Sequence, residues 1–410
     1  MNKKKKQLEL LAPAGNMAKM KTAFAFGADA VYAGIPDFSL RVRINDFDLE
    51  KIKEATDFAH EQNKKIYITI NIFAHNKHLK NLPTYVKQLK KIGVDALIIS
   101  DPGVLDLVKD VWPEAEIHLS TQANCTNWRS AKFWFEAGVK RVILGREVTL
   151  KEIKDIKKQV PKLELEYFVH GAMCMAYSGR CFLSKYFLDR SGNLGDCVQP
   201  CRWNYFISEE KRPNQPLELV EEEHGSYILN SKDLCFIKYL KDLVEAGVTG
   251  FKIEGRAKSV YYQAVVNNIY AYAIRNLDRL KNKDWENLYQ ELDTKLNHRG
   301  YTIGFLLGEK ADQEIEKTHQ KSKWEFCGQV LESENNKIIV KVHNTLKLGD
   351  EIEIVRPNYD IIKMKLDKMI DIKNREDLKE AHGGDGGQTV IIEVGQEVPE
   401  LSVIRRKIIN

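Results

Sequence analysis

The sequence predicts an α/β fold, a TIM-type (β/α)8 barrel with a cysteine-rich excursion, followed by a small C-terminal β-barrel. Through the first 280 residues one rhythm repeats, in which a short apolar strand is followed by a turn and an amphipathic helix, as in folds built from βα units. Several expected helices end at glycine, at Gly93, Gly138 and Gly247, which helix C-termini favour. No GxGxxG follows the first strand, so a barrel is favoured over a doubly wound open sheet.

Eight strands are expected in the barrel, each a short apolar run bounded by turn residues. They are Leu8–Leu11, Ala30–Ala33, Lys65–Ile72, Ala96–Ser100, Glu116–Ser120, Arg141–Leu144, Leu163–Val169 and Gly250–Glu254. Amphipathic helices are expected between them, among them Leu49–Gln62, Pro83–Ile92 and Leu150–Val160. A ninth strand-like run, Tyr227–Asn230, is assigned to the excursion because the eight places are already filled.

The predicted barrel domain spans residues 1–283, with the cysteine-rich insertion at 171–225, and residues 284–320 are expected to be a linker with a short helix. From Trp324 the chain changes to the alternation typical of strands, at Lys337–Val342, Glu351–Val355, Lys363–Ile370 and Thr389–Glu393, with turns at Gly349–Asp350 and Gly383–Gly387. The β-barrel domain predicted for 321–410 is either a packing appendage or a module that docks RNA or a partner, and the sequence favours neither.

The composition fits a soluble, two-domain protein. The chain has 410 residues, of which 43% are hydrophobic and 30% charged, and no apolar run is long enough for a membrane span. The lysine run within Met1–Gln7 has no apolar segment behind it, so it is not a secretory signal and a cytoplasmic location is expected. A formal net charge of +5 permits an anionic partner without requiring one.

Cysteines are the most informative residues. Five of the seven fall close together, at Cys174, Cys181, Cys197, Cys201 and Cys235. Disulfides are not expected in a chain without an export signal. Gathered thiolates suit a [4Fe–4S] cluster or a structural zinc ion, and the absence of CxxC spacing favours the cluster. The alternative is a set of separate buried thiols.

The same region resembles peptidase family U32, the collagenase-like protease family. It matches the family signature at Glu166, Phe168, Gly171, Ala172, Met173, Cys174, Gly179, Cys181, Leu183 and Ser184. Further similar segments are LLAPAGN from residue 10, AVYAG at 30–34, STQAN at 120–124, NSKDLC at 230–235, FKIEGR at 251–256 and RGYTIGF at 299–305. The resemblance covers nearly the whole chain, including the C-terminal part.

This resemblance implies oxygen-independent hydroxylation rather than proteolysis, since better-understood members are hydroxylases. GDCVQPCRW at 195–203 is similar to the branch that hydroxylates tRNA. That branch implies 5-hydroxyuridine formation at the wobble position, with tRNA as partner, prephenate as co-substrate and a [4Fe–4S] cluster. Cys174, Cys181 and Cys197 match the family's cluster ligands. The fourth is expected to be Cys235, whose motif lies at a strand-to-helix turn, with Cys201 as the alternative.

The remaining site candidates lie at the expected ends of barrel strands, where such enzymes place their chemistry. Glu166, His170, Glu254 and Arg256 are the expected catalytic group, with His170 as a proton shuttle beside the cluster. A dicarboxylate needs cationic partners, so Arg180 and Lys252 are the expected substrate anchors. Gln122 is expected to face the pocket; Asn127 faces the pocket or caps a helix.

Two alternatives to a hydroxylase stay open. A peptidase needs an activated nucleophile or a zinc ion with an open position. The sequence has neither HExxH nor GxSxG, and thiols that bind a metal cannot also be free nucleophiles, although a Cys–His pair remains conceivable. The other alternative is a non-catalytic iron–sulfur scaffold that acts with a partner protein.

Overall fold

A computed structural model describes residues 8–36, 38–39, 46–174, 180–181, 183–203, 231–308, 322–384 and 386–408. The N-terminal lysine run, Gly179 of the family signature and the strand-like run Tyr227–Asn230 lie outside the described residues. No helix of the described part is long and apolar enough to cross a lipid bilayer.

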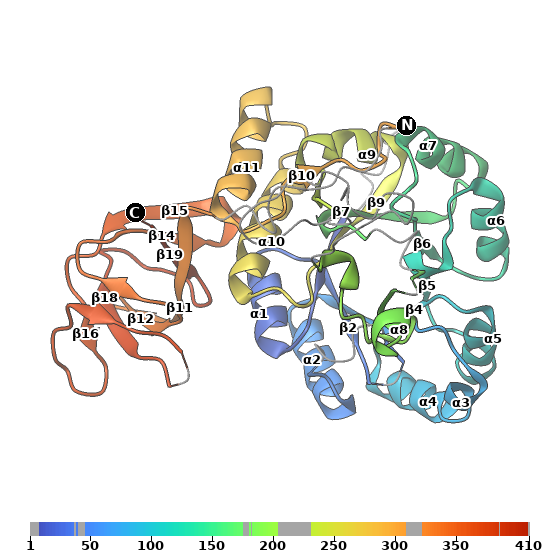
Figure 1. The fold of residues 1–410 in the computed structure, drawn as a ribbon, viewed down its shortest axis with the longest axis horizontal. Helices are drawn as coiled ribbons and strands as arrows, with labels where there is room; N and C mark the ends of the chain where they lie inside the picture. Colours follow the sequence, from blue (N-terminus) through green and yellow to red (C-terminus); the bar gives the residue numbers. More distant parts are fainter. Residues whose placement is uncertain are drawn as a thin grey trace, which may run out of the picture. The chain divides into compact units, whose positions relative to one another are not determined.

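Eight parallel strands form a closed barrel, which confirms the predicted fold class (Figure 1). They are β1 (Glu9–Pro13), β2 (Ala30–Gly34), β3 (Lys65–Ile70), β4 (Ala96–Ile99), β5 (Ile117–Leu119), β6 (Arg141–Ile143), β7 (Glu164–Ala172) and β9 (Val248–Ile253). Each pairs with the next in this order, and β9 returns to β1. All eight predicted strands are present, with ends that differ by a few residues.

Helices follow the barrel strands in sequence, and local capping signals set their ends. The helices are α1 (Met17–Ala25), α2 (Leu49–Glu61), α3 (Asn76–Leu79), α4 (Leu82–Ile92), α5 (Pro102–Val111), α6 (Trp128–Glu136), α7 (Leu150–Gln159), α8 (Leu183–Leu188), α9 (Leu240–Ala246), α10 (Val260–Arg275) and α11 (Asn282–Lys295). The Asp48 side chain accepts a hydrogen bond at the start of α2, and Thr149 and Glu152 form a capping box at α7. Gly93 ends α4 with φ +85°.

Two short strands add to the barrel sheet beyond the eight. β8 (Asp233–Cys235) pairs antiparallel with the end of β7, where Cys235 lies opposite His170. β10 (Tyr301–Thr302) then pairs parallel with β8. A buried ion pair between Arg299 and Asp233 joins the two segments. The sequence analysis did not predict these strands, because two or three residues carry too little periodicity to be recognised.

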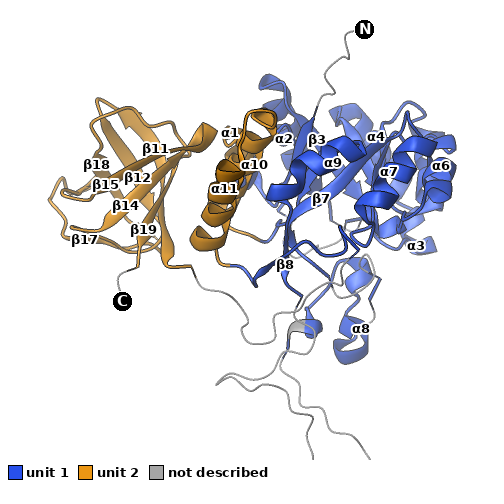
Figure 2. Ribbon diagram, turned by 90° about the horizontal axis from the view of Figure 1, so that it is seen from above, with its two compact units in different colours: residues 1–20, 29–257, 298–320 blue, residues 21–28, 258–297, 321–410 orange. Residues whose placement is uncertain are grey.

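The chain divides into two compact units, coloured separately in Figure 2. The first comprises residues 1–20, 29–257 and 298–320, and the second comprises 21–28, 258–297 and 321–410. The segment expected to be a linker contains most of the 14-residue helix α11 and the strand β10. The first unit holds the barrel strands and every cysteine except Cys327.

The second unit contains an antiparallel sheet of seven strands in the order β15-β14-β19-β11-β12-β18-β16. Their bounds are β11 (Trp324–Glu334), β12 (Lys337–Val342), β14 (Glu351–Arg356), β15 (Asp360–Lys365), β16 (Ile370–Asp371), β18 (Thr389–Glu393) and β19 (Val403–Lys407); β13 (Leu346–Lys347) pairs separately with β17 (Glu380–Ala381). Alternate residues of these strands enclose an apolar core that includes Val330, Val340 and Ile354.

Two predicted C-terminal strands, Lys337–Val342 and Thr389–Glu393, have the bounds found for β12 and β18. The prediction of one strand over Lys363–Ile370 is wrong, since β15 ends at Lys365 and Ile370 begins β16. Leu366 and Met369, between the two, are fully buried. Their apolar side chains extended the strand pattern in the sequence, although the chain leaves the sheet there.

Candidate active site

A cavity of about 440 Å³ lies at the C-terminal ends of the barrel strands, where barrel enzymes place their chemistry. Strand-end residues form its inner wall, and the cysteine-rich excursion forms the other side. From the strands and their loops come Tyr32, Thr69, Asn71, Ser120, Gln122, Arg146, Phe168, Lys252, Glu254 and Arg256, and from the excursion Cys174, Arg180, Cys181, Cys197, Pro200 and Cys201. The cavity has the volume of a small-molecule site.

Four thiols line this cavity together: Cys174, Cys181, Cys197 and Cys201. Burial raises the pKa of Cys181, and the neighbouring Cys174 and Cys197 add to the rise, because thiolates at close range repel one another. The backbone N–H of Leu183 donates to Cys181 Sγ at 3.4 Å. The Ser184 hydroxyl donates to Cys197 Sγ at 3.7 Å. Such donors stabilise negative charge on sulfur.

Cys235, the thiol preferred from sequence as the fourth ligand, does not line the cavity. It belongs to β8, is 4% exposed, and lies opposite His170 in the antiparallel pair with β7. Cys201, the sequence alternative, belongs instead to the short 3-10 helix Pro200–Arg202 at the cavity wall. The structure therefore brings Cys201, and not Cys235, to the cavity that holds the other three thiols.

The cavity thiols can be compared with the ligands that a metal ion or a cluster needs. Within the described ranges, no three His, Cys, Asp or Glu side chains converge closely enough to hold one metal ion. In a [4Fe–4S] cluster four thiolates each bind a different iron, so the sulfurs stand further apart than around one zinc. Four cysteines around one cavity supply four thiolates of the kind that such a cluster needs.

Cationic side chains dominate the rest of the lining. Arg146, Arg180, Lys252 and Arg256 line the cavity together with one carboxylate among the described residues, Glu254. The Lys252 ammonium lies 4.2 Å from the centre of the Tyr32 ring. At Gly34 of β2 a Cβ would lie 2.5 Å from Arg256 Nη1, so the missing side chain lets the guanidinium lie against the strand. This arrangement favours an anionic ligand.

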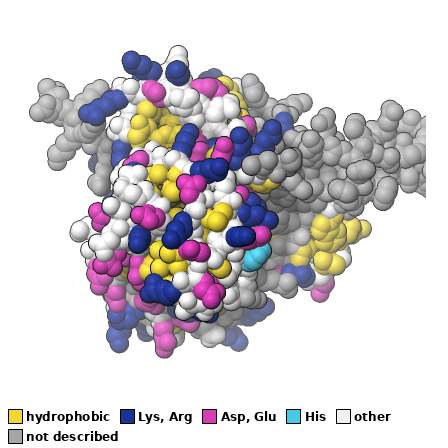
Figure 3. Space-filling view, turned by 90° about the vertical axis from the view of Figure 1, so that its left-hand side faces the viewer, with side chains coloured by type: hydrophobic (Ala, Val, Ile, Leu, Met, Phe, Trp, Pro, Cys, Tyr) yellow, Lys and Arg dark blue, Asp and Glu magenta, His cyan; other side chains and the backbone are white. Residues whose placement is uncertain are grey.

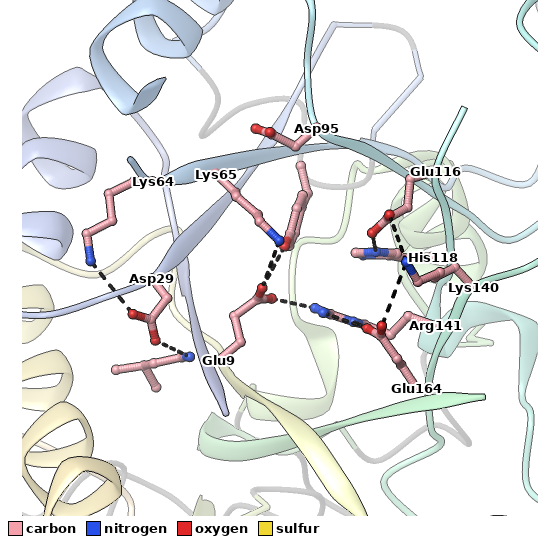
Figure 4. A network of polar contacts seen from close by, with 12 residues as sticks. Glu9, Asp29, Lys64, Lys65, Asp95, Glu116, His118, Lys140, Arg141 and Glu164 are labelled. Atoms are coloured by element: carbon pink, nitrogen blue, oxygen red, sulfur yellow. Dashed lines mark hydrogen bonds and ion pairs between the residues drawn. The ribbon is translucent and has the colours of Figure 1, made fainter. Parts of the chain in front are cut away.

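A layer of buried charges lies inside the barrel at its N-terminal end (Figure 4). Arg141 of β6 donates to Glu9, to Glu164 Oε2 at 2.9 and 3.0 Å, and to Glu166 Oε2 at 3.2 Å. The Tyr67 hydroxyl donates to Glu9 at 2.8 Å. Each charge here has a hydrogen-bonded partner of opposite sign or a polar donor, as a buried charge requires.

Glu166 connects this layer to the cavity. Its Oε1 accepts a hydrogen bond from Lys252 Nζ at 3.1 Å. Burial alone would raise the pKa of Glu166, but Lys252 and Arg141 outweigh burial and hold the pKa below its usual range. Burial lowers the pKa of Lys252, and Glu166 opposes that shift. Glu166 is therefore an ionised partner that holds the Lys252 ammonium from within the barrel.

Only two of the four residues predicted to be catalytic line the cavity. Glu254 and Arg256 line the cavity, as do the predicted substrate anchors Arg180, Lys252 and Gln122. Glu166 and His170 do not. The Glu166 side chain is inaccessible to solvent within the barrel, and His170 is buried with its ring 5.4 Å from that of Tyr301. Strand-end position in the sequence did not distinguish these cases, because Glu166 contacts Arg141 and Lys252 within the barrel and His170 lies where β7 pairs with β8.

Asn127 and Arg146 both follow barrel strands but have different roles. Asn127 accepts a hydrogen bond from Ser130 N at 3.0 Å and caps α6, so it has the helix-capping role that was one of its two expected roles. Arg146, which lines the cavity, was missed. The available signal was its place three residues after β6, where a charged residue follows a barrel strand.

Two family descriptions together match most of the chain. The family description "Peptidase family U32" matches residues 15–316, and "Peptidase family U32 C-terminal domain" matches residues 322–405. The chain is 41% identical over 396 residues to the tRNA hydroxylation protein P of Escherichia coli (strain K12), covering 86% of this chain and 87% of that protein.

Two other relatives carry different names. The 23S rRNA 5-hydroxycytidine C2501 synthase of Escherichia coli (strain K12) is 37% identical over 316 residues, which cover 75% of this chain and 46% of that protein. A collagenase of Porphyromonas gingivalis (strain ATCC BAA-308 / W83) is 29% identical over 415 residues, 95% of each chain.

Proposed function

The chain belongs to peptidase family U32, and from this premise we propose that it is an enzyme that hydroxylates tRNA. The observation that carries the proposal is the 41% identity to a tRNA hydroxylation protein across most of both chains. Identity to the collagenase is lower, at 29%. A second relative is named for hydroxylation of another RNA, which supports the reaction class independently of the tRNA substrate.

The finer proposal is formation of 5-hydroxyuridine at the wobble position, with prephenate as co-substrate. The cationic cavity supports a small organic anion as ligand. Arg256, Lys252 and Arg180 would contact its carboxylates, because ammonium and guanidinium groups form charge-assisted hydrogen bonds with carboxylates. Glu166 would hold Lys252 in place through their 3.1 Å contact.

We also propose that Cys174, Cys181, Cys197 and Cys201 hold a [4Fe–4S] cluster, which would supply one-electron redox chemistry at the cavity. The shared cavity of these thiols and the hydrogen bonds to Cys181 and Cys197 support this assignment. The role of the chain's own residues is to hold the anion through their cationic side chains and the cluster through the four thiolates, within one cavity.

The peptidase alternative is less well supported by the cavity. A cysteine nucleophile needs a histidine base within hydrogen-bonding reach. No histidine is among the described residues that line the cavity, and His170 is buried against Tyr301. The scaffold alternative makes a different prediction, since a non-catalytic scaffold would not need a cationic ligand cavity.

The test is nucleoside mass spectrometry of tRNA from a strain that lacks this gene. We expect loss of 5-hydroxyuridine, and restoration by the full-length chain. A chain with Arg256→Ala should not restore it, because the proposed anion would lose a charge-assisted partner. Arg129→Ala, at an exposed arginine on α6 outside the cavity, should restore it fully. Unchanged 5-hydroxyuridine in the deletion strain, in the absence of a second gene copy, would reject the tRNA assignment.

A further inference from the structure

Arg146 occupies a fixed position at the cavity wall. It lies in the loop between β6 and α7, and its side chain is 10% exposed. The Tyr167 hydroxyl donates to the carbonyl of Arg146 at 3.2 Å and to that of Val148 at 2.7 Å, which holds the loop against β7. The guanidinium lies 4.2 Å from the centre of the Phe168 ring, a cation–π contact that orients its plane.

This buried guanidinium is incompletely paired. Its ion-pair partner is Glu254, but Nη2 and Glu254 Oε2 are 3.8 Å apart, which is beyond hydrogen-bonding distance. The buried Arg146 Nε has no hydrogen-bond partner within the described part of the chain. A guanidinium has five N–H donors in a fixed plane, so burial without acceptors is unfavourable unless a ligand supplies them.

Other buried arginines of the chain show the contrast. Arg141 donates to three carboxylates at the barrel floor, and Arg299 pairs with Asp233. In the second unit Arg405 pairs with Glu353 and Glu291. Each of these guanidiniums reaches a carboxylate at hydrogen-bonding distance. The Arg146 side chain is slightly more exposed, at 10%, and lines the cavity, where the missing acceptor would be a ligand.

A second cavity residue has unused hydrogen-bonding capacity. The buried Oε1 of Gln122 has no hydrogen-bond partner among the residues that the structure describes. Gln122 lies in the 3-10 helix Thr121–Ala123 after β5, and Arg146 follows β6, the neighbouring strand in the barrel. A cationic hydrogen-bond donor, Arg146, and a neutral acceptor, Gln122, are therefore available on adjacent strand ends of one cavity.

We infer that Arg146 is the specificity-determining anchor for a carboxylate group of a small organic anion, and that Gln122 accepts a hydroxyl of the same ligand. The inference rests on the proposed function, in which prephenate is the co-substrate. It adds that Arg146 supplies a further charge-assisted contact through its guanidinium, whose Nε has no hydrogen-bond partner among the described residues.

Calorimetric titration of prephenate into protein purified without oxygen tests the inference. Arg146→Gln should weaken prephenate binding about ten- to a hundredfold, the loss expected for a charge-assisted hydrogen bond. Arg129→Gln is the matched control, since Arg129 also lies over an aromatic ring, that of Trp128, but is exposed and outside the cavity. Its dissociation constant should equal that of the unaltered protein.

Two further measurements separate ligand binding from a structural role. The ligand-free Arg146→Gln protein should melt at the same temperature as the unaltered protein or higher, because it no longer buries an underpaired charge. A titration with uridine 5′-monophosphate distinguishes a carboxylate site from a phosphate site. The inference is supported if Arg146→Gln weakens prephenate binding and leaves nucleotide binding unchanged.

Prephenate binding that is absent in the unaltered protein, or equal in Arg146→Gln and the control, would overturn the inference. The inference would also be overturned if Arg146→Gln weakened the binding of uridine 5′-monophosphate and not that of prephenate. These outcomes are independent of the tRNA readout. If Arg146→Gln weakens prephenate binding but the deletion strain keeps its 5-hydroxyuridine, the proposed function is rejected and the role of Arg146 as an anchor is retained. If the deletion strain loses 5-hydroxyuridine but Arg146→Gln binds prephenate as well as the control does, the proposed function is retained and the anchor is rejected.

Discussion

Cys201 and Cys235 show how position in the sequence and position in space differ at the scale of single residues. Both follow three cysteines that match the family's cluster ligands. Cys201 lines the cavity with those three thiols, whereas Cys235 lies within a strand pair. Because a thiolate must reach the metal to bind it, this position supports Cys201 as the proposed fourth ligand.

We therefore predict that Cys201→Ser loses the iron and that Cys235→Ser keeps it. Serine cannot replace a thiolate as a soft ligand. The measurement is iron content and absorption of protein purified without oxygen, where the unaltered chain should hold about four irons. Cys125→Ser is the control, since burial raises the pKa of that thiol to about 12 and it lies outside the cavity. Iron loss in Cys235→Ser alone would return the fourth position to Cys235.

At the scale of elements, β7 shows how the strand period distributes roles among consecutive residues. Glu166 and Phe168 reach the barrel interior and cavity, while Tyr167 between them holds the β6–α7 loop. Successive side chains of a strand point to opposite faces. Glu166 of this strand thus contacts Lys252 inside the barrel, and Tyr167 holds the loop of Arg146 from the opposite face of the strand.

Strand β5 carries a pH-dependent contact. His118 Nε2 lies 3.0 Å from Oε1 of Glu116, the residue before β5. This hydrogen bond, aided by Lys140, lowers the pKa of Glu116 to about 2. A carboxyl whose pKa is lowered in the folded state stabilises that state above its unfolded pKa, and the contribution is lost as the pH falls toward the folded pKa.

Glu116→Gln should therefore lower the melting temperature at pH 7, and the difference from the unaltered protein should shrink as the pH falls below about 4.5 toward 2. Melting curves at a series of pH values measure this. Glu114→Gln, which removes an exposed pair with Lys90, should have little effect at any pH. A Glu116→Gln difference that grows on acidification would contradict the assignment.

At the scale of the whole molecule, the 63 basic and 58 acidic residues nearly balance in number. The formal net charge is +5, and the face shown in Figure 3 mixes acidic and basic side chains. Affinity for nucleic acid that comes from phosphate contacts scales with their number and falls with salt. Such a molecule should recognise tRNA with few phosphate contacts.

Binding of the full chain to tRNA should therefore weaken only about ten- to a hundredfold between 50 and 200 mM salt, compared with the larger losses of proteins that make six to ten phosphate contacts. Fluorescence anisotropy with labelled tRNA at several salt concentrations measures the slope. A loss of more than a thousandfold would show that an extensive basic surface contacts the tRNA.

The sequence by itself determined the repeating elements and the family. Apolar periodicity placed the eight barrel strands, since burying one face of each element requires that pattern. Signature residues around Cys174 and Cys181 pointed to the family, and the strand-end residues Glu254 and Arg256 pointed to the site.

The tertiary structure decided which of those residues share the cavity. It placed Cys201 and not Cys235 at the cavity, kept Glu166 and His170 away from the cavity lining, and brought Arg146 into it. The physical reason is that a ligand cavity is made by side chains from several strand ends and an excursion. Their meeting depends on barrel closure and side-chain direction, which no local pattern encodes.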